Sequence, residues 1–342
     1  MTELKGRGRR NGRGCCGGGC VLGILTLVAM LMVIAAWGLQ RWPGEDWWLT
    51  TLLTWGPQVQ WVLPPTLVLL VTVARRRRFL SLLNAATTVF ALLAVAHFQV
   101  NPVHPDPGDR PVMRAATWNV HGYTRDRETL RDRILSWNCD VVCLQESNRA
   151  VLEDLLPGYE QAIEDTLAVY VRGEILRHER VFLGEKSPRK ALLVEAVTDA
   201  GPVTIINVHL PRVARSPFPR EVEPFSELMA RAVEEREARI LTLLDTLPSE
   251  DPAILAGDFN TPPGSRYWRL LDRHLIDAFE ATGFGFGHTF LLRWRYPLLR
   301  IDYVWVGGGA EPVYSETRSE YPSDHRPVIA DIALPPREER EG

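Results

Sequence analysis

The feature that most constrains this chain is an uncharged, apolar run from Val21 to Leu39. A helix over this run is long enough to cross a hydrocarbon core of about 30 Å. The run exceeds the apolar part of a cleaved signal peptide, roughly 7–15 residues, and lacks a convincing small-residue cleavage site, so we expect it to be retained. The sequence therefore predicts a chain divided between a membrane anchor and a part exposed to water.

Two further apolar segments extend the predicted transmembrane region to residues 21–100. Residues 80–100 are almost wholly apolar, whereas residues 50–74 include two glutamines and two adjacent prolines. We predict three helices, over 21–39, 50–74 and 80–100. Tryptophans cluster where side chains would meet lipid headgroups, at Trp42, Trp47, Trp48, Trp55 and Trp61.

The distribution of charge predicts the orientation of these helices. Basic residues cluster in residues 1–20 and again in residues 75–78. Lys and Arg remain on the cytoplasmic side, so both clusters are expected in the cytoplasm, separated by two spans. A third span then leads the chain out, which predicts a multi-pass protein of the cell membrane with an extracytoplasmic C-terminal part.

The part after residue 100 has its own organisation. Residues 101–111 are rich in proline and predict a linker, residues 112–335 predict one domain, and residues 336–342 form a charged tail. Acidic residues outnumber basic ones after residue 100. That overall sign argues against broad affinity for a polyanion such as duplex DNA.

Within residues 112–335, short β-type runs alternate with amphipathic helical ones, which predicts a mixed α/β (α+β) domain. Polar residues follow several apolar strands, as they would if the strand ends converged on one site. The segments are Trp118-Asn119-Val120-His121, Gln145-Glu146-Ser147, Asn207-Val208-His209-Leu210, Gly257-Asp258-Phe259-Asn260, Ile301-Asp302-Tyr303 and Ser323-Asp324-His325-Arg326-Pro327. One Asp or Asn at a strand end is usually a turn former, but six such sets together indicate a functional site.

The residue types in these segments suit metal-assisted phosphoester chemistry. Mg²⁺ prefers carboxylate and amide oxygens and keeps several waters for its substrate. Hydrolysis of a phosphodiester also needs a positioned water, neutralised phosphoryl oxygens and an acid near the leaving group. Asp258, His209 and His325 are candidates for these tasks.

In this order along the chain, the six segments resemble the motifs of the endonuclease/exonuclease/phosphatase superfamily, the deoxyribonuclease-I-like fold. The resemblance covers about residues 112–334. It implies a four-layer α/β/β/α sandwich of two packed mixed sheets, with the site at one edge of the sheets.

The resemblance also implies a metal site and a cofactor. Glu146 corresponds to the principal metal ligand, Asn119 lies beside it, and Asp324 adds negative charge near the metal. The implied cofactor is Mg²⁺ or Mn²⁺.

The implied catalytic residues come from the other segments. Asp258 would orient or deprotonate the attacking water, and Asn260 would hold the phosphoryl group. His325 would donate to the phosphate, steadied by Asp302 on the far side of its ring. His209 matches a second phosphate-contacting position.

Three more residues are candidates for binding the substrate. His121 departs from the aspartate that several DNA-repair members carry two residues after the asparagine, which weakens a repair-nuclease assignment. It either assists the metal or phosphate or caps its own turn. Arg212 follows His209 and Arg300 precedes Asp302, on two loops that also contain Arg215, Arg220, Arg293 and Arg295. Arginine suits anionic oxygens, although solvated loop charge is the alternative for each.

The sequence thus predicts a membrane-anchored, divalent-metal-dependent phosphoester hydrolase. A lipid headgroup or a small soluble phosphoester fits the acidic balance better than long duplex DNA. An extracytoplasmic endonuclease or exonuclease and a catalytically silent membrane scaffold are the alternatives. No obligate protein partner is implied.

Overall fold

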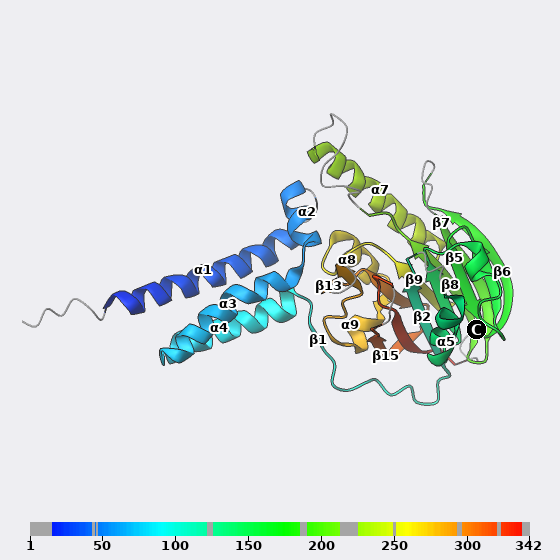
Figure 1. The fold of residues 1–342 in the computed structure, drawn as a ribbon, viewed down its shortest axis with the longest axis horizontal. Coiled ribbons are helices and arrows are strands. Elements are labelled where there is room, and N and C mark those ends of the chain that lie inside the picture. Colours follow the sequence, from blue (N-terminus) through cyan, green and yellow to red (C-terminus); the bar gives the residue numbers. More distant parts are fainter. Residues whose placement is uncertain are drawn as a thin grey trace, which may run out of the picture. The chain divides into compact units, whose positions relative to one another are not determined.

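The computed structural model describes residues 16–42, 45, 47–121, 126–184, 190–212, 225–248, 251–292, 296–319 and 323–336 (Figure 1). The chain separates into two compact units. The helical unit comprises residues 1–38 and 59–96, and the sheet unit comprises residues 39–58 and 97–342. The basic N-terminus up to residue 15 and residues 337–342 of the predicted tail lie outside the described residues.

Helices make up the whole described part of the helical unit. They are α1 (Cys16–Arg41), whose last residues belong to the sheet unit, the 3-10 helix η2 (Gln58–Val62), α3 (Leu63–Ala74), α4 (Arg78–Phe90) and the π-helical turn η3 (Ala91–Val95). Among the described residues, Gly18–Arg41 and Arg78–Val95 are long and apolar enough to cross a membrane. The pair Trp48–Trp55 and Gln58–Ala74 gives a third candidate, as a broken span that is bent by 87° at its junction.

The observed helices differ from the predicted ones at two places. The helix predicted over 50–74 is interrupted at Gly56 and Pro57, since proline lacks the N–H that would continue the ladder. The helix predicted over 80–100 ends at Val95, and His97 follows with a φ of 53°, a left-handed residue typical of a helix end.

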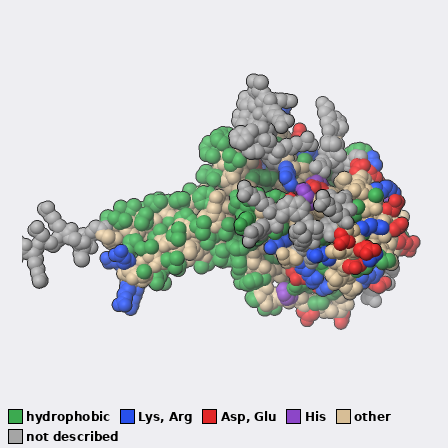
Figure 2. Space-filling view, viewed as in Figure 1, with side chains coloured by type: hydrophobic (Ala, Val, Ile, Leu, Met, Phe, Trp, Pro, Cys, Tyr) green, Lys and Arg blue, Asp and Glu red, His purple; other side chains and the backbone are tan. Residues whose placement is uncertain are grey.

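Two polar residues of the helical unit bond to each other in its interior. The buried Asn84 of α4 donates a hydrogen bond of 2.8 Å to Thr26 Oγ1 of α1. Interhelical hydrogen bonds of this kind hold apolar helices together in lipid. Hydrophobic side chains cover the outside of these helices (Figure 2). The described helices of this unit are therefore apolar on their outer surface.

Two six-stranded sheets form the sheet unit, and we name each after an active-site candidate. The Asn119 sheet has the order β15 (Glu311–Thr317), β16 (Val328–Ala333), β2 (Val112–Asn119), β3 (Val141–Gln145), β5 (Leu167–Val171), β4 (Glu160–Glu164). The Asp258 sheet has the order β10 (Ile276–Asp277), β14 (Asp302–Gly307), β9 (Ala253–Asp258), β8 (Gly201–His209), β7 (Lys190–Thr198), β6 (Gly173–Phe182). Two small pairs accompany them, β1 (Gln99–Val100) with β11 (Phe284–Gly285) and β12 (Phe290–Leu292) with β13 (Tyr296–Leu299).

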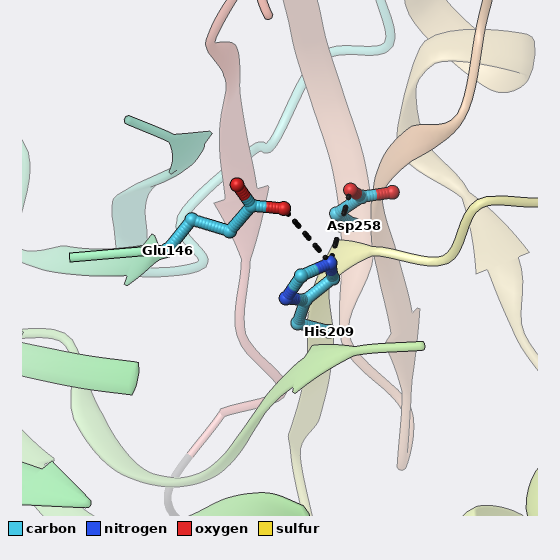
Figure 3. A group of neighbouring side chains, drawn as sticks. All are labelled: Glu146, His209 and Asp258. Carbon is cyan, nitrogen blue, oxygen red and sulfur yellow. Dashed lines mark ion pairs between the residues drawn. The ribbon is translucent and has the colours of Figure 1, made fainter. Parts of the chain in front are cut away.

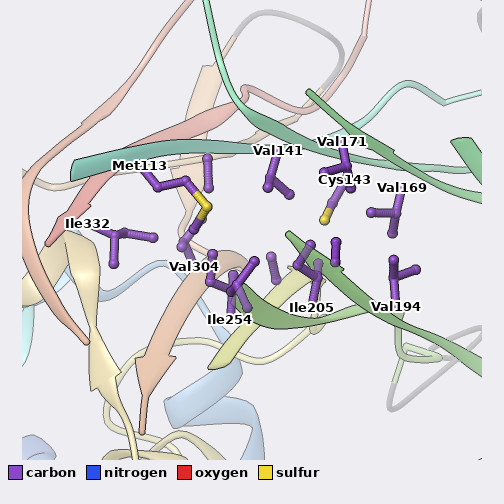
Figure 4. Close-up of a cluster of buried hydrophobic side chains, with 14 of the residues drawn as sticks. Met113, Val141, Cys143, Val169, Val171, Val194, Ile205, Ile254, Val304 and Ile332 are labelled. Carbon is purple, nitrogen blue, oxygen red and sulfur yellow. The ribbon is translucent and has the colours of Figure 1, made fainter. Parts of the chain in front are cut away.

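The main core lies between these two sheets (Figure 4). In β3, Val141 and Cys143 point into this core while Val142 and Leu144 point to the other face. Successive side chains of a strand alternate between faces, so a strand buried on both sides reads as a continuous apolar run.

Helices cover the two outer faces. The outer face of the Asn119 sheet packs against α5 (Arg127–Ser136) and α6 (Arg149–Leu152). The outer face of the Asp258 sheet packs against α7 (Phe225–Thr246) and α8 (Arg266–Asp272), and the short helices α2 (Trp48–Trp55) and α9 (Ala278–Thr282) complete the unit. The result is the predicted four-layer α/β/β/α sandwich.

The sheet unit begins earlier in the chain than residue 112. Asn101, in the predicted linker, donates hydrogen bonds to the carbonyls of Glu280 and Gly283, at 2.9 and 3.0 Å. β1 pairs with β11 just before it. These contacts satisfy backbone groups that a free linker would leave to water, so the segment folds with the domain.

Asn207 joins the two sheets across the core. From β8 it donates hydrogen bonds to the carbonyls of Leu144 and Ala168 in the other sheet, at 3.0 and 2.8 Å, and accepts one from Gln145 Nε2 at 2.7 Å. Its side chain is completely buried. Two of the polar strand-end residues found in the sequence therefore connect the layers.

We expect Asn207→Ala to lower the free energy of unfolding by about 3 kcal/mol, because two buried carbonyls and the Gln145 amide lose partners. Thermal unfolding of the full chain in detergent, followed by near-UV circular dichroism, measures this. Thr204→Ala, on the same strand but half-buried, is the control and should cost less than about 1 kcal/mol. An equal loss of unfolding free energy in the two variants would contradict the role of Asn207 in joining the two sheets.

Candidate active site

Strand pairing brings the polar strand ends to one edge. In the Asp258 sheet, Asp258 is directly opposite His209 on one side and Asp302 on the other. Gly257 permits this pairing, since a Cβ there would lie 2.0 Å from the Val208 carbonyl oxygen. In the Asn119 sheet, Asn119 at the end of β2 pairs with Gln145, the residue before Glu146.

Asp258 is the centre of the site and is only 1% exposed. Its Oδ2 accepts hydrogen bonds from Asn119 Nδ2 at 3.0 Å and Asn260 Nδ2 at 3.1 Å, and its Oδ1 accepts one from the Asn260 backbone at 2.8 Å. Burial and the charge of Asp302 raise the pKa of Asp258 above its ordinary value. A carboxylate so placed has an increased tendency to take up a proton.

His325 and Asp302 form a buried pair beside Asp258. The ring Nδ1 lies 2.8 Å from Asp302 Oδ2, and Nε2 lies 3.9 Å from Asp258 Oδ2. Among the described residues, Nε2 has no hydrogen-bond partner although it is buried. Burial alone would lower the pKa of His325, but Asp302 and Asp258 raise it to about 9. The imidazolium therefore has one N–H free to donate to a ligand.

Hydrogen bonds from neighbouring segments fix this histidine. The Trp118 indole donates to the His325 carbonyl at 3.0 Å. Ser323 Oγ donates to the Asn119 carbonyl at 2.6 Å and accepts from the His325 backbone at 3.0 Å. The loop before β16 is thus tied to the end of β2.

Glu146, His209 and Asp258 form a group whose side chains converge (Figure 3). His209 Nε2 lies 3.2 Å from Glu146 Oε1 and 3.6 Å from Asp258 Oδ2. Burial would raise the pKa of Glu146, but His209, Asn119 and His121 together hold it below its ordinary value. Glu146 is therefore ionised at neutral pH, as a metal ligand must be.

His121 and Asp324 complete this side of the site. His121 Nδ1 lies 3.4 Å from Glu146 Oε2 and 3.3 Å from Asp324 Oδ1. The His121 backbone donates to Asn119 Oδ1 at 3.0 Å, and its φ is 43°. Asn119 Oδ1 therefore closes the turn that contains His121, and the His121 ring lies near two carboxylates.

The donor set fits a divalent cation that prefers oxygen. Glu146, Asp258, Asp324 and Asn119 supply carboxylate and amide oxygens, which suit Mg²⁺ and Mn²⁺. Three ligand atoms from Glu146, His209 and Asp258 lie within 4.8 Å of one another.

The two candidate arginines differ in position. Arg212 is exposed, and its guanidinium lies over the Phe290 ring, which in turn packs on His325. Arg300 is 2% exposed and forms an ion pair of 2.6 Å with Asp277 in the interior. This buried pairing leaves Arg300 no route to a substrate, so Arg212 is the one of these two arginines that stays a substrate-binding candidate. Arg215, Arg220, Arg293 and Arg295 lie outside the described residues.

Arg236 is a residue that sequence reasoning missed. The charged stretch Glu234-Glu235-Arg236-Glu237 is typical of the outer face of a helix, yet Arg236 is 1% exposed. Its Nη1 donates to the carbonyls of Phe259 and Asn260 and to Thr261 Oγ1, at 2.7, 3.2 and 2.7 Å. The signal was present in its spacing, since it lies three residues after Val233 and four before Ile240, on the buried stripe of α7.

The pairing of His325 with Asp302 predicts a pH dependence of stability. Because its pKa is raised from 6.5 to about 9, protonated His325 stabilises the fold fully below pH 6.5, and this contribution is lost as pH rises through 9. In EDTA, we expect the thermal midpoint to fall less between pH 6.5 and 9.5 for Asp302→Asn than for the wild type.

Asp331→Asn is the control for this experiment. Asp331 pairs with Arg114 at 2.6 Å, and arginine does not titrate in this range. The control should lower stability and leave its slope with pH unchanged. If the thermal midpoint of Asp302→Asn changed with pH as steeply as that of the wild type, the result would contradict the coupling between Asp302 and the titration of His325.

Comparisons with known proteins agree with this geometry. The model of the endonuclease/exonuclease/phosphatase family matches residues 116–325, more than half of the chain. No curated protein matches it.

Several solved structures share the fold. One from Enterococcus faecalis V583, of unknown function, is 21% identical, with 65% of this chain and 100% of that chain covered and a TM-score of 0.52. A family protein from Bacteroides vulgatus is 20% identical, covering 66% and 99%, with a TM-score of 0.53. A mannosyl-6-phosphatase from Bacteroides thetaiotaomicron VPI-5482 is 16% identical, covering 65% and 100%, with a TM-score of 0.54.

At these identities the solved structures establish the fold, and the family model establishes the kinship. The chain belongs to the endonuclease/exonuclease/phosphatase family, whose members are divalent-metal-dependent hydrolases of phosphoester bonds.

Proposed function

We propose that this protein is a membrane-anchored phosphodiesterase or phosphatase that uses Mg²⁺ or Mn²⁺, with Asp258 orienting the attacking water. The observation that carries the proposal is the position of the Asp258 carboxylate. It is buried between the Glu146–His209 group and the His325–Asp302 pair, with amide donors on two sides. A general base and a hydrogen-bond donor thus flank one reacting position.

Each residue has a task that follows from its surroundings. Asp258, whose pKa is raised, accepts a proton from water. Protonated His325 donates from Nε2 to a phosphoryl oxygen, and Asp302 keeps its ring in that orientation. A bound divalent cation supplies neutralisation of the phosphoryl charge. Glu146, Asn119 and Asp324 would hold it.

Three other residues would contact the phosphoryl group or the rest of the substrate. His209 Nε2 points into the same group of side chains (Figure 3). Asn260 is held beside Asp258, by a bond from its Nδ2 to the Leu210 carbonyl at 2.8 Å. Arg212 lies at the rim through its contact with Phe290. We assign the exposed arginine to anionic parts of the substrate.

The membrane arrangement is part of the proposal. Three spans would place the basic clusters in the cytoplasm and the sheet unit outside. The second of these spans would be Gln58–Ala74 without α2, because the two are bent by 87° at their junction. At the rises of a 3-10 helix and an α-helix this segment is about 28 Å long, close to the hydrocarbon thickness of about 30 Å. A reporter fused after Gly342 that is active only in the cytoplasm would overturn this topology.

The test uses the full chain in detergent, because residues 39–58 fold with the sheet unit and a truncation at residue 101 would remove them. Hydrolysis of bis-p-nitrophenyl phosphate and p-nitrophenyl phosphate is measured with Mg²⁺, Mn²⁺ or EDTA. Metal-dependent turnover supports the proposal, and lipid phosphoesters, nucleotides and oligonucleotides then decide the substrate. Cleavage of oligonucleotides with strong salt dependence would favour the nuclease instead. Absence of turnover from folded, metal-binding protein would favour the silent scaffold.

A further inference from the structure

Residues 39–58 are built into the sheet unit although they lie between two helices of the anchor. Both carboxylate oxygens of the buried Glu45 accept hydrogen bonds from the Arg266 backbone, at 2.9 and 3.1 Å, at the start of α8. The helix that follows, α2, packs against α7 (Figure 1). This segment is therefore fixed on the enzyme rather than a loose connection.

The surface pattern of α2 is the reverse of that of a helix in water. Its threonines Thr50, Thr51 and Thr54 are buried, with at most 1% exposed. Leu49 and Leu52 are exposed by 37 and 48%. Trp48, the first residue of α2, is also exposed, as are Trp42 and Trp47 before the helix. A helix at a protein–water boundary points its apolar stripe inward.

The inward threonines are satisfied by local hydrogen bonds. Thr50 Oγ1 donates to the Trp47 carbonyl at 2.8 Å, Thr51 Oγ1 to the Glu45 carbonyl at 3.2 Å, and Thr54 Oγ1 to the Thr50 carbonyl at 2.9 Å. The buried face thus needs no water. The apolar face, visible over α2 in Figure 2, needs an apolar medium.

The covering medium follows from composition and connectivity. Tryptophan is concentrated at the level of lipid headgroups in membrane proteins. The segment follows the candidate span that ends at Arg41. It precedes Gln58–Ala74, the second span of the proposed topology, which would hold both ends of the segment near a membrane surface. We propose that α2 is an interfacial helix that lies in the headgroup region with Trp48, Leu49 and Leu52 toward lipid, an inference that rests on the proposed membrane anchor.

Spin labels on single cysteines test the proposal in the full chain, reconstituted in phosphatidylcholine–phosphatidylglycerol vesicles. Cys15, Cys16 and Cys20 are replaced by serine, and Cys139 and Cys143 are buried. Labels are placed by Leu49→Cys and Leu52→Cys on α2. Leu31→Cys on α1 reports the anchor, and Leu176→Cys on β6, 58% exposed, is the matched aqueous control.

Power-saturation spectroscopy compares the access of oxygen, which concentrates in lipid, with that of a water-soluble nickel chelate. We expect oxygen to dominate at Leu31, Leu49 and Leu52, and nickel to dominate at Leu176. Nickel access at Leu49 and Leu52 with oxygen access at Leu31 would overturn the interfacial helix alone. Nickel access at Leu31 would overturn the anchor. Exclusion of both reagents from Leu49 and Leu52 would indicate a protein partner, and would also overturn the proposal.

A different observation carries a second inference. The guanidinium of Arg236 lies over the ring of Trp55, the last residue of α2, at 4.9 Å from the centroid of that ring. The same guanidinium donates hydrogen bonds to the carbonyls of Phe259 and Asn260. Arginine on an aromatic face loses little freedom when it bridges several acceptors. We infer that Arg236, braced by Trp55, is a positioning residue that keeps Asn260 beside Asp258.

Hydrogen exchange of the full chain measures this effect without relying on turnover. In Trp55→Ala, the backbone amides of residues 259–261 should exchange about 10-fold faster, because the equilibrium for local opening of this loop would shift by the same factor. Trp55→Phe keeps an aromatic face and should resemble the wild type. Trp48→Ala, on the exposed face of α2, is the control and should leave these amides unchanged.

Kinetics provide a second readout. Trp55→Ala should lower kcat for bis-p-nitrophenyl phosphate and leave KM unchanged, because the substrate site stays while its catalytic geometry loosens. Unchanged exchange at residues 259–261 in Trp55→Ala would overturn the inference. Acceleration of exchange throughout the domain would also overturn it, since Trp55 would then act on the whole fold.

Discussion

Asp258→Asn should lower kcat for bis-p-nitrophenyl phosphate by about 10²- to 10⁴-fold, the range that loss of a general base costs. We expect the variant to unfold in EDTA at a temperature no lower than the wild type. The raised pKa of Asp258 means that its ionised form is disfavoured in the folded protein. The contribution of Asp258 to the free energy of unfolding is therefore greatest below the pKa that this residue has in the unfolded chain, and it is lost as pH rises through the pKa that it has in the folded protein. An uncharged Asn avoids that loss at neutral pH.

Turnover by the full chain and thermal unfolding of the same preparation measure both effects. Asp199→Asn, in the exposed turn after β7, is the control and should change neither. A variant that loses activity together with its fold would assign Asp258 a structural role. A variant that keeps more than about a tenth of the activity would remove it from the chemistry.

Glu146→Gln should abolish stabilisation by metal as well as turnover. A ligand at 100 times its Kd stabilises the folded state by about 2.7 kcal/mol, so Mn²⁺ should raise the thermal midpoint of the wild type. Glu146 is ionised and is the carboxylate shared by the His209 and His121 contacts. Its loss should weaken metal binding by more than the roughly 10–100-fold that an outer-shell partner costs.

Calorimetric titration with Mn²⁺ and the metal-induced shift of the thermal midpoint give this result independently of any substrate. Glu174→Gln, on an exposed position of β6, is the matched control. An unchanged shift in Glu146→Gln would place the metal among other residues, such as the Asp258, Asp302 and His325 group. Loss of the shift with full retention of turnover would contradict metal dependence.

The candidate site was accessible from sequence because strand ends are local signals. Apolar runs predicted the strands, and the polar residues after them predicted one edge of the sheet. The structure brings Asn119, Glu146, His209 and Asp258 together there, with Asp302, Asp324 and His325 beside them. Parallel pairing of β2 with β3 and of β8 with β9 accounts for this, since parallel strands end at the same edge.

Whether a loop side chain points outward or into the interior could not be predicted from these local sequence signals. Arg212 and Arg300 have similar distances in sequence from a motif, yet one lies on the rim and the other pairs with Asp277 inside. Ion pairs in the interior depend on residues far along the chain. The same holds for Asn207, whose partners belong to another sheet.

By itself, the sequence determined the apolar N-terminal segment, the alternation of strands and helices, and which polar residues gather at one edge of the sheets. Those properties follow from local composition and from the periods of 2 and 3.6 residues. Only the tertiary structure decided that residues 39–58 belong to the enzyme, that α2 turns its threonines inward, and that Arg236 supports the loop of Asp258. Each depends on packing between segments distant in sequence, which no local period encodes.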